Sequence, residues 1–136
     1  MYQELLNSFA SVENLGGKAW EHAYIIDLLN ERPIRDCSIH CFHYQQMLEC
    51  LFKHILEAKS KFQVYSKSHK LHKLLEEVIG LTDFRTDKTK YRHYLVTITV
   101  CAEEYRYNFE LDCEVYFEMV NVCDELLREL IAFLIA

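Results

Sequence analysis

Residues 42–56 read FHYQQMLECLFKHIL and space their apolar side chains as on one face of a helix. The apolar positions recur at intervals of three and four residues, the mark of an amphipathic helix: Cys41, Tyr44, Met47/Leu48, Leu51/Phe52 and Ile55. We therefore expect a long helix over about residues 35–58. An amide pair, Gln45-Gln46, lies inside it and is followed by Glu49 and Lys53. Amides in such a place need a reason, either a buried polar network that orients the helices or a ligand.

The composition indicates one helical domain over residues 1–136. The chain is 51% hydrophobic and contains one proline and three glycines, which favours helices over a turn-rich β fold. No apolar run approaches the ~20 residues of a membrane span, so no membrane partner is expected. The start, Met1-Tyr2-Gln3-Glu4, does not resemble a signal peptide, and we expect a cytoplasmic protein.

The six cysteines form no C-x-x-C pair, and we expect all of them to be reduced. Cys37, His40, Cys41 and His43 are suitable residue types for zinc, but no second pair with matching spacing follows. The prediction is that the chain holds no metal and no cofactor.

The charge is distributed unevenly along the chain. The formal net charge of −6 argues against non-specific nucleic-acid binding. Six of the nine lysines fall between Lys53 and Lys73, whereas residues 103–129 hold nine acids against Arg106 and Arg128. This polarity indicates either two solvated faces or an anion-binding side.

The remaining elements follow from periodicity and from helix-ending residues. A short helix over residues 2–14 is expected to end at Gly16-Gly17, so that residues 1–17 form an N-terminal helix and a break. A helix over residues 18–30 should end before Pro33. Residues 59–68 suggest a loop, and Ser68 can cap a short helix through Ile79, ended by Gly80 in the left-handed conformation.

The last third of the chain fits two patterns. Val96, Ile98 and Val100 alternate with threonines, and residues 107–115 alternate similarly, as in a β-hairpin. Helical spacing fits the same residues over a longer range, and no Asn-Gly or Gly-rich hairpin turn is present. We favour two helices over about residues 88–105 and 112–135, the first of them capped by Asp87.

The candidate binding residues are cationic, aromatic or imidazole groups near predicted helix ends. Arg106 lies between Tyr105 and Tyr107; its guanidinium could bind a phosphate, or it could pair with Glu103, Glu110 or Asp112. His69, with Lys70 and Lys73, opens a short helix where an anion could bind. The chain has no G-x-S-x-G elbow, P-loop or G-x-G-x-x-G.

In this order the motifs resemble the HEPN family (higher eukaryotes and prokaryotes nucleotide-binding domain), related to the helical domain of kanamycin-type nucleotidyltransferases. The resemblance rests on aromatic-His-x-Gln-Gln-x-x-Glu-x-x-x-Lys over 42–53, on His69-Lys70-Leu71 and on Arg106-Tyr107-Asn108. It implies an all-α, antiparallel up-and-down bundle of four to five helices. It also implies a homodimer, a nucleotidyltransferase partner in a toxin–antitoxin pair, or a nucleotide or RNA ligand.

Some HEPN proteins are metal-independent ribonucleases that use Arg-x(4–6)-His. In this chain, the positions after Arg106 hold Leu111, Asp112 and Cys113 instead of a histidine. Arg35 and His40 have the spacing but lie at the start of the long helix, which we interpret as chance. The sequence therefore favours a protein without catalytic residues.

Three hypotheses follow from these residues. The first is a non-catalytic nucleotide-binding or protein-interaction module, and its expected site comprises Gln46, Lys53, His69, Lys73, Arg106 and Tyr107. The second is a ribonuclease with a degenerate site of Arg106 with His69 or His93. The third is a structural protein that self-associates through its apolar end, residues 130–136.

Overall fold

A computed structural model describes residues 1–12, 14–32, 35–61, 65–104 and 110–136. Within these ranges the regular structure is entirely helical, which confirms the all-α prediction and the two-helix interpretation of the last third. The helices are α1 (Tyr2–Leu5), the 3-10 helix η1 (Asn7–Phe9), α2 (Leu15–Asn30), α3 (Ser38–Lys59), α4 (Leu71–Leu81), α5 (Lys88–Glu104) and α6 (Cys113–Ile135).

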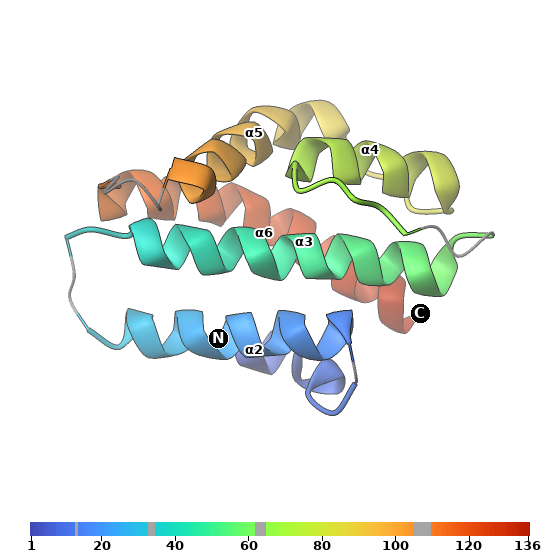
Figure 1. Cartoon of the computed structure of the whole chain (residues 1–136), viewed down its shortest axis with the longest axis horizontal. Helices are drawn as coiled ribbons and strands as arrows, with labels where there is room; N and C mark the ends of the chain where they lie inside the picture. The colour runs from blue at the N-terminus through green and yellow to red at the C-terminus, as the bar shows by residue number, and fades with distance from the viewer. Residues whose placement is uncertain (13, 33–34, 62–64, 105–109) are drawn as a thin grey trace.

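Helix α3 lies at the centre of the molecule (Figure 1) and contacts α2, α4, α5 and α6. Helices α2 and α3 run in opposite directions, as do α4 and α5 (Figure 1). Helices α3 and α4 run in the same direction, because the chain after α3 turns back along that helix before α4 begins (Figure 1). Helix α6 runs in this direction too (Figure 1). This return places the segment before α4 beside the middle of α3, where the candidate site lies.

One continuous apolar core connects the helices. It includes every residue of the predicted apolar face of α3: Cys41, Tyr44, Met47, Leu48, Leu51, Phe52 and Ile55. Leu130 and Ile131 of α6 are also buried in this core, and Phe133 packs edge to face on Phe84 at 5.4 Å. Much of the apolar C-terminal segment therefore completes the core.

A buried carboxylate ties three helices together inside the core. Asp124 of α6 accepts hydrogen bonds from the Tyr44 hydroxyl at 2.7 Å and from the Tyr2 hydroxyl at 3.1 Å. Asp124 is only 5% exposed, and burial raises its pKa although the two tyrosine hydroxyls favour the charged form. We refer to Asp124, Tyr2 and Tyr44 as the closed cluster.

The glycines occupy positions different from those predicted. Gly16 and Gly17 lie in the first turn of α2 and do not end a preceding helix, because residues 2–9 form only the short α1 and η1. A side chain at Gly17 would meet the carbonyl oxygen of Val12, so close approach explains this glycine. Gly80 lies inside α4, and no described glycine has a positive φ.

Of the two predicted side-chain caps, Asp87 is confirmed and Ser68 is not, and Asp112 is a third cap that was not predicted. The Asp87 side chain accepts from the Lys90 backbone N–H at 3.3 Å, so the predicted cap of α5 is confirmed. Asp112 caps α6 by accepting from Glu114 N–H at 2.8 Å. The prediction that Ser68 caps the short helix is wrong. Helix α4 begins at Leu71, and the Ser68 hydroxyl accepts from the N–H of Lys70, the residue before the helix.

A disulfide joins Cys37 and Cys113, which corrects the prediction that all six cysteines are reduced. Cys41, Cys50, Cys101 and Cys123 are free and buried. The bonded pair is separated by 76 positions, and spacing rules for nearby cysteines do not reach a pair brought together by folding. No helix within the described ranges is long and apolar enough to cross a membrane.

Candidate functional site

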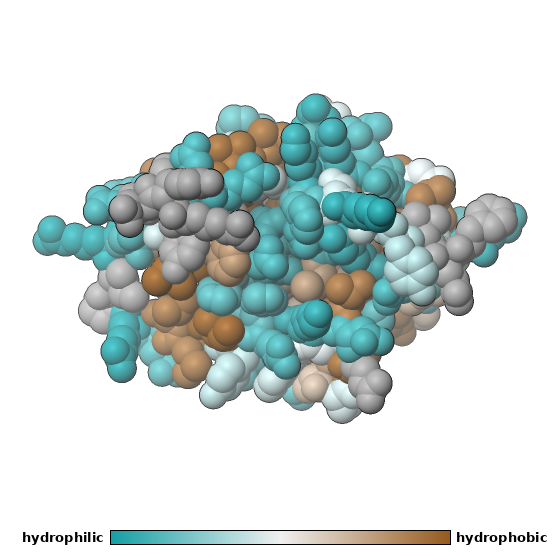
Figure 2. Space-filling model, viewed as in Figure 1, coloured by the Kyte–Doolittle hydropathy of each residue, from teal (hydrophilic) through white to brown (hydrophobic). Residues whose placement is uncertain are grey.

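A groove of about 590 Å³ lies where α3, the end of α5 and the segment before α4 meet. The described residues that line it are Phe42, Gln45, Gln46, Glu49, His69, Ala102 and Glu103. Figure 2 shows that hydrophilic residues cover the middle of the face in front of α3, whereas hydrophobic residues gather near the joined ends of α2 and α3. The amide pair noted in the sequence, Gln45-Gln46, therefore lines this groove.

Gln45 holds the returning segment against α3. Its Nε2 donates to the Glu49 carboxylate at 3.1 Å and to the His69 backbone carbonyl at 3.0 Å, while its Oε1 accepts from Gln46 at 2.6 Å. Both acceptors of Nε2 are oxygens, which determines the orientation of the amide. Because both N–H groups are used, Gln45 has a structural role.

Glu49 is the centre of the network. Its side chain is 9% exposed, and its Oε1 accepts from the His69 ring at 3.1 Å while Oε2 pairs with Lys53 Nζ at 3.3 Å. A buried carboxylate with two such partners is held in one orientation. We refer to Glu49, Gln45, Gln46, His69 and Lys53 as the open cluster.

His69 is the most accessible member of the open cluster, with a side chain that is 73% exposed. Its Nδ1 faces a carboxylate oxygen, which can only accept, so Nδ1 carries a hydrogen. When the ring is neutral, Nε2 is left as an acceptor. Gln46 uses one amide N–H within the described part of the chain, so its other N–H and its carbonyl are available to a ligand.

Two histidines pair between α2 and α3, close enough to the open cluster to feel the charge of Glu49. The Nδ1 atoms of His22 and His43 are 2.9 Å apart, which requires one to donate and the other to accept. Burial, followed by the charge of His43, lowers the pKa of His22 to about 4. Burial also lowers the pKa of His43, so the pair is neutral at neutral pH.

The chemistry of the groove favours neutral, hydrogen-bonding ligands over a bare anion. Glu49 and Glu103 bring carboxylates to it, and Lys53 is engaged with Glu49. Amide, carboxylate and imidazole groups can bind the amino and hydroxyl groups of a base or sugar, and the ring of Phe42 adds an aromatic surface. The described residues contain no group of three or more His, Cys, Asp or Glu that could hold a metal ion.

The structure brings together some of the predicted site residues. Gln46 and His69 line the groove, and Lys53 reaches it through Glu49. Lys73 is exposed on α4, and His93 is exposed on α5 with its ring on Tyr94 at 5.6 Å; neither lines the groove. Arg106 and Tyr107 lie outside the described residues.

Sequence reasoning missed the contributions of Ala102 and Glu103. The sequence suggests Glu103 only as a possible partner of Arg106, yet Glu103 lines the groove. The helical spacing of α5 predicts that Ala102 faces the core but not which other helix its last turn meets. Only the contact between α5 and α3 shows this.

Comparisons with protein-family models, with curated proteins and with solved structures find no match to this chain. The resemblance to HEPN domains therefore remains a prediction from motifs, and the function has to be argued from the groove itself.

Proposed function

We propose that this chain is a non-catalytic nucleotide-binding module, HEPN-like in its bundle and cytoplasmic, and that the groove on α3 holds the base and ribose. The observation that carries the proposal is the open cluster, in which a buried carboxylate and an amide pair form one wall with an exposed imidazole. Glu49 and Gln45 are held by each other and by the backbone of His69, so the wall is rigid. Gln46 and His69 keep hydrogen-bonding groups for a ligand.

The division of roles within the open cluster supports a base-and-sugar site. Gln46 offers a donor and an acceptor, as an amide that pairs with a base edge does. Glu49 and Glu103 would repel a phosphate placed beside them but accept from ribose hydroxyls. In this proposal the phosphate extends away from the two carboxylates, and Arg106 with Tyr107 are the residues assigned to it.

Titration calorimetry with nucleosides, nucleotides and dinucleotides tests the proposal. We expect Gln46→Ala and His69→Ala to weaken binding about tenfold each, since each removes one or two hydrogen bonds from the ligand. Lys73→Ala and His93→Ala are matched controls outside the groove and should bind as the parent protein does. Arg106→Ala should weaken nucleotides more than nucleosides.

Two outcomes would replace this proposal. No heat with any member of the panel would remove nucleotide binding, and capture of a nucleotidyltransferase on immobilised protein would then favour the interaction module. Cleavage of RNA in the presence of EDTA, lost in Arg106→Ala, would favour the ribonuclease. Light scattering gives the oligomeric state, for which we propose a homodimer from the family resemblance.

A further inference from the structure

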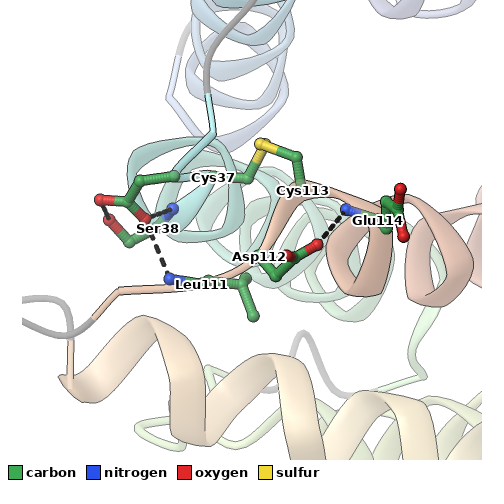
Figure 3. Close-up of a disulfide and its surroundings, with 7 residues drawn as sticks. Cys37, Ser38, Leu111, Asp112, Cys113 and Glu114 are labelled. Carbon is green, nitrogen blue, oxygen red and sulfur yellow. Dashed lines mark hydrogen bonds between the residues drawn. A yellow bond between two sulfur atoms is a disulfide. The ribbon is translucent and has the colours of Figure 1, made fainter.

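The Cys37–Cys113 disulfide lies at the starts of the two longest helices. Cys37 is the residue before α3 and Cys113 is the first residue of α6, and their sulfurs join the helix starts directly (Figure 3). The N-terminal end of a helix carries partial positive charge and favours a thiolate placed there. At both cysteines the helix start favours a thiolate, and at Cys37 this opposes the effect of burial.

A second cavity reaches this disulfide. It measures about 410 Å³ and is lined by Cys37, Cys113, His40, Asn30, Glu31, Arg32 and Phe117. The two sulfur-bearing residues differ in access, since Cys37 is 1% exposed whereas Cys113 is half-buried. A molecule in the cavity would thus reach Cys113 more easily than Cys37.

His40 adds an independent polar group to the cavity. It is 2% exposed, its ring packs on Tyr116 at 5.6 Å, and its Nδ1 has no hydrogen-bond partner within the described part of the chain. Such buried polar atoms are uncommon and need an explanation. His40 is therefore a buried polar group in the lining of the cavity that reaches the disulfide.

We propose that Cys37–Cys113 is a thiol–disulfide exchange site for small thiols, with Cys113 as the sulfur that is attacked. An external thiolate forms a bond to Cys113 Sγ, the bond between the two sulfurs breaks, and Cys37 leaves as a thiolate that takes a proton from solvent. A second external thiol then attacks the mixed disulfide and releases Cys113. Two thiols are oxidised to one disulfide, and the protein disulfide is reduced to two thiols.

The surrounding junction allows the reaction to reverse. Asp36 accepts from the backbone N–H groups of Ser38 at 3.0 Å and Leu111 at 2.9 Å. Cys37 N–H donates to the Leu111 carbonyl at 2.7 Å. These bonds do not involve sulfur, so they hold the two helix starts near one another after reduction.

Single-cysteine replacements test the predicted asymmetry with oxidised glutathione as the probe. Cys37→Ser leaves Cys113 accessible and should form the mixed disulfide about ten times faster than Cys113→Ser, in which the remaining thiol is buried. Intact mass spectrometry after an alkylating quench measures both rates. Equal rates, or a faster reaction of Cys113→Ser, would overturn the assignment of the attacked sulfur.

The parent protein provides a measurement that does not depend on the variants folding. Under native conditions, millimolar reduced glutathione should open the disulfide, and peptide mapping of the quenched intermediate should find glutathione on Cys113. Reduction that occurs only in denaturant would show that the bond is a closed structural staple and would overturn the proposal, as would glutathione found mainly on Cys37.

Discussion

The closed and open clusters each centre on a buried carboxylate, yet they differ in what surrounds it. Asp124 is bound by two tyrosine hydroxyls from α1 and α3, with Tyr44 completely buried. Glu49 is bound by an amide, a lysine and an imidazole, and its histidine partner is 73% exposed. Both carboxylates are thus buried. The clusters differ in how far the carboxylate's partners are exposed to solvent, and this exposure distinguishes a candidate site from a structural group.

The difference also appears in the hydrogen-bonding capacity that is left over. In the closed cluster the hydroxyls of Tyr2 and Tyr44 donate to Asp124 and are enclosed in the core. In the open cluster Gln46 and His69 have unused hydrogen-bonding groups, and both residues line a groove of about 590 Å³. The comparison predicts that substitutions in the closed cluster mainly lower stability and that substitutions in the open cluster mainly weaken ligand binding.

The largest expected effect is that of Asp124→Ala. The substitution leaves two buried hydroxyls without their acceptor and should lower the free energy of unfolding by about 3 kcal/mol. Urea denaturation at pH 7 measures it. A cost under about 1 kcal/mol would mean that the closed cluster does not hold the helices together.

Tyr44→Phe and Tyr116→Phe form a matched pair in the same core. Both hydroxyls are buried, but the Tyr44 hydroxyl donates to Asp124 at 2.7 Å, whereas Tyr116 Oη has no hydrogen-bond partner among the described residues. We expect Tyr44→Phe to cost about 2 kcal/mol and Tyr116→Phe to be neutral or stabilising, because the second removes only an unsatisfied group. Thermal and urea unfolding compare them, and equal losses would contradict the special role of Asp124.

Acid should act through the histidine pair beside the open cluster. The pKa of His22 is about 4 in the folded protein, below the ordinary histidine value of 6.5, so the unfolded chain binds more protons between these values. This contribution is complete above pH 6.5 and is lost as pH falls towards 4. The raised pKa of Asp124 acts in the opposite direction, since the folded state then binds the extra proton.

His22→Gln isolates this effect. The parent protein should lose about 1 kcal/mol more stability than the variant between pH 7 and pH 5, a figure reduced to allow for solvent screening of a half-buried ring. Parallel urea titrations at the two pH values provide the comparison. Identical losses in both proteins would exclude His22 as the group responsible.

The smallest expected effect on stability is that of Glu49→Gln. The amide keeps the shape of the side chain but weakens the pairing with Lys53 and His69, both partly or largely accessible to water. We expect a loss of about 0.5–1 kcal/mol, well below that of Asp124→Ala. A larger loss would show that the open cluster is as structural as the closed one.

Much of the fold follows from local signals in the chain. The apolar spacing of residues 41–55 predicts α3 and its buried face, and the caps at Asp87 and Asp112 accompany the starts of α5 and α6. The alternation at residues 96–100 misleads only over a short stretch, because the helical pattern continues beyond it. Gly17 does not follow from such a signal. A glycine is needed there because a side chain would meet the carbonyl oxygen of Val12.

The order of residues determines which segments become helices and which face of α3 is buried, because periodicity and capping act over a few neighbouring positions. It also marks Gln45, Gln46, Glu49 and His69 as polar residues that need partners. Packing alone decides that the chain turns back so that the carbonyl of His69 meets Gln45. Packing likewise brings Cys37 to Cys113. Such contacts join residues far apart in the chain and depend on the arrangement of all the helices, which no local pattern encodes.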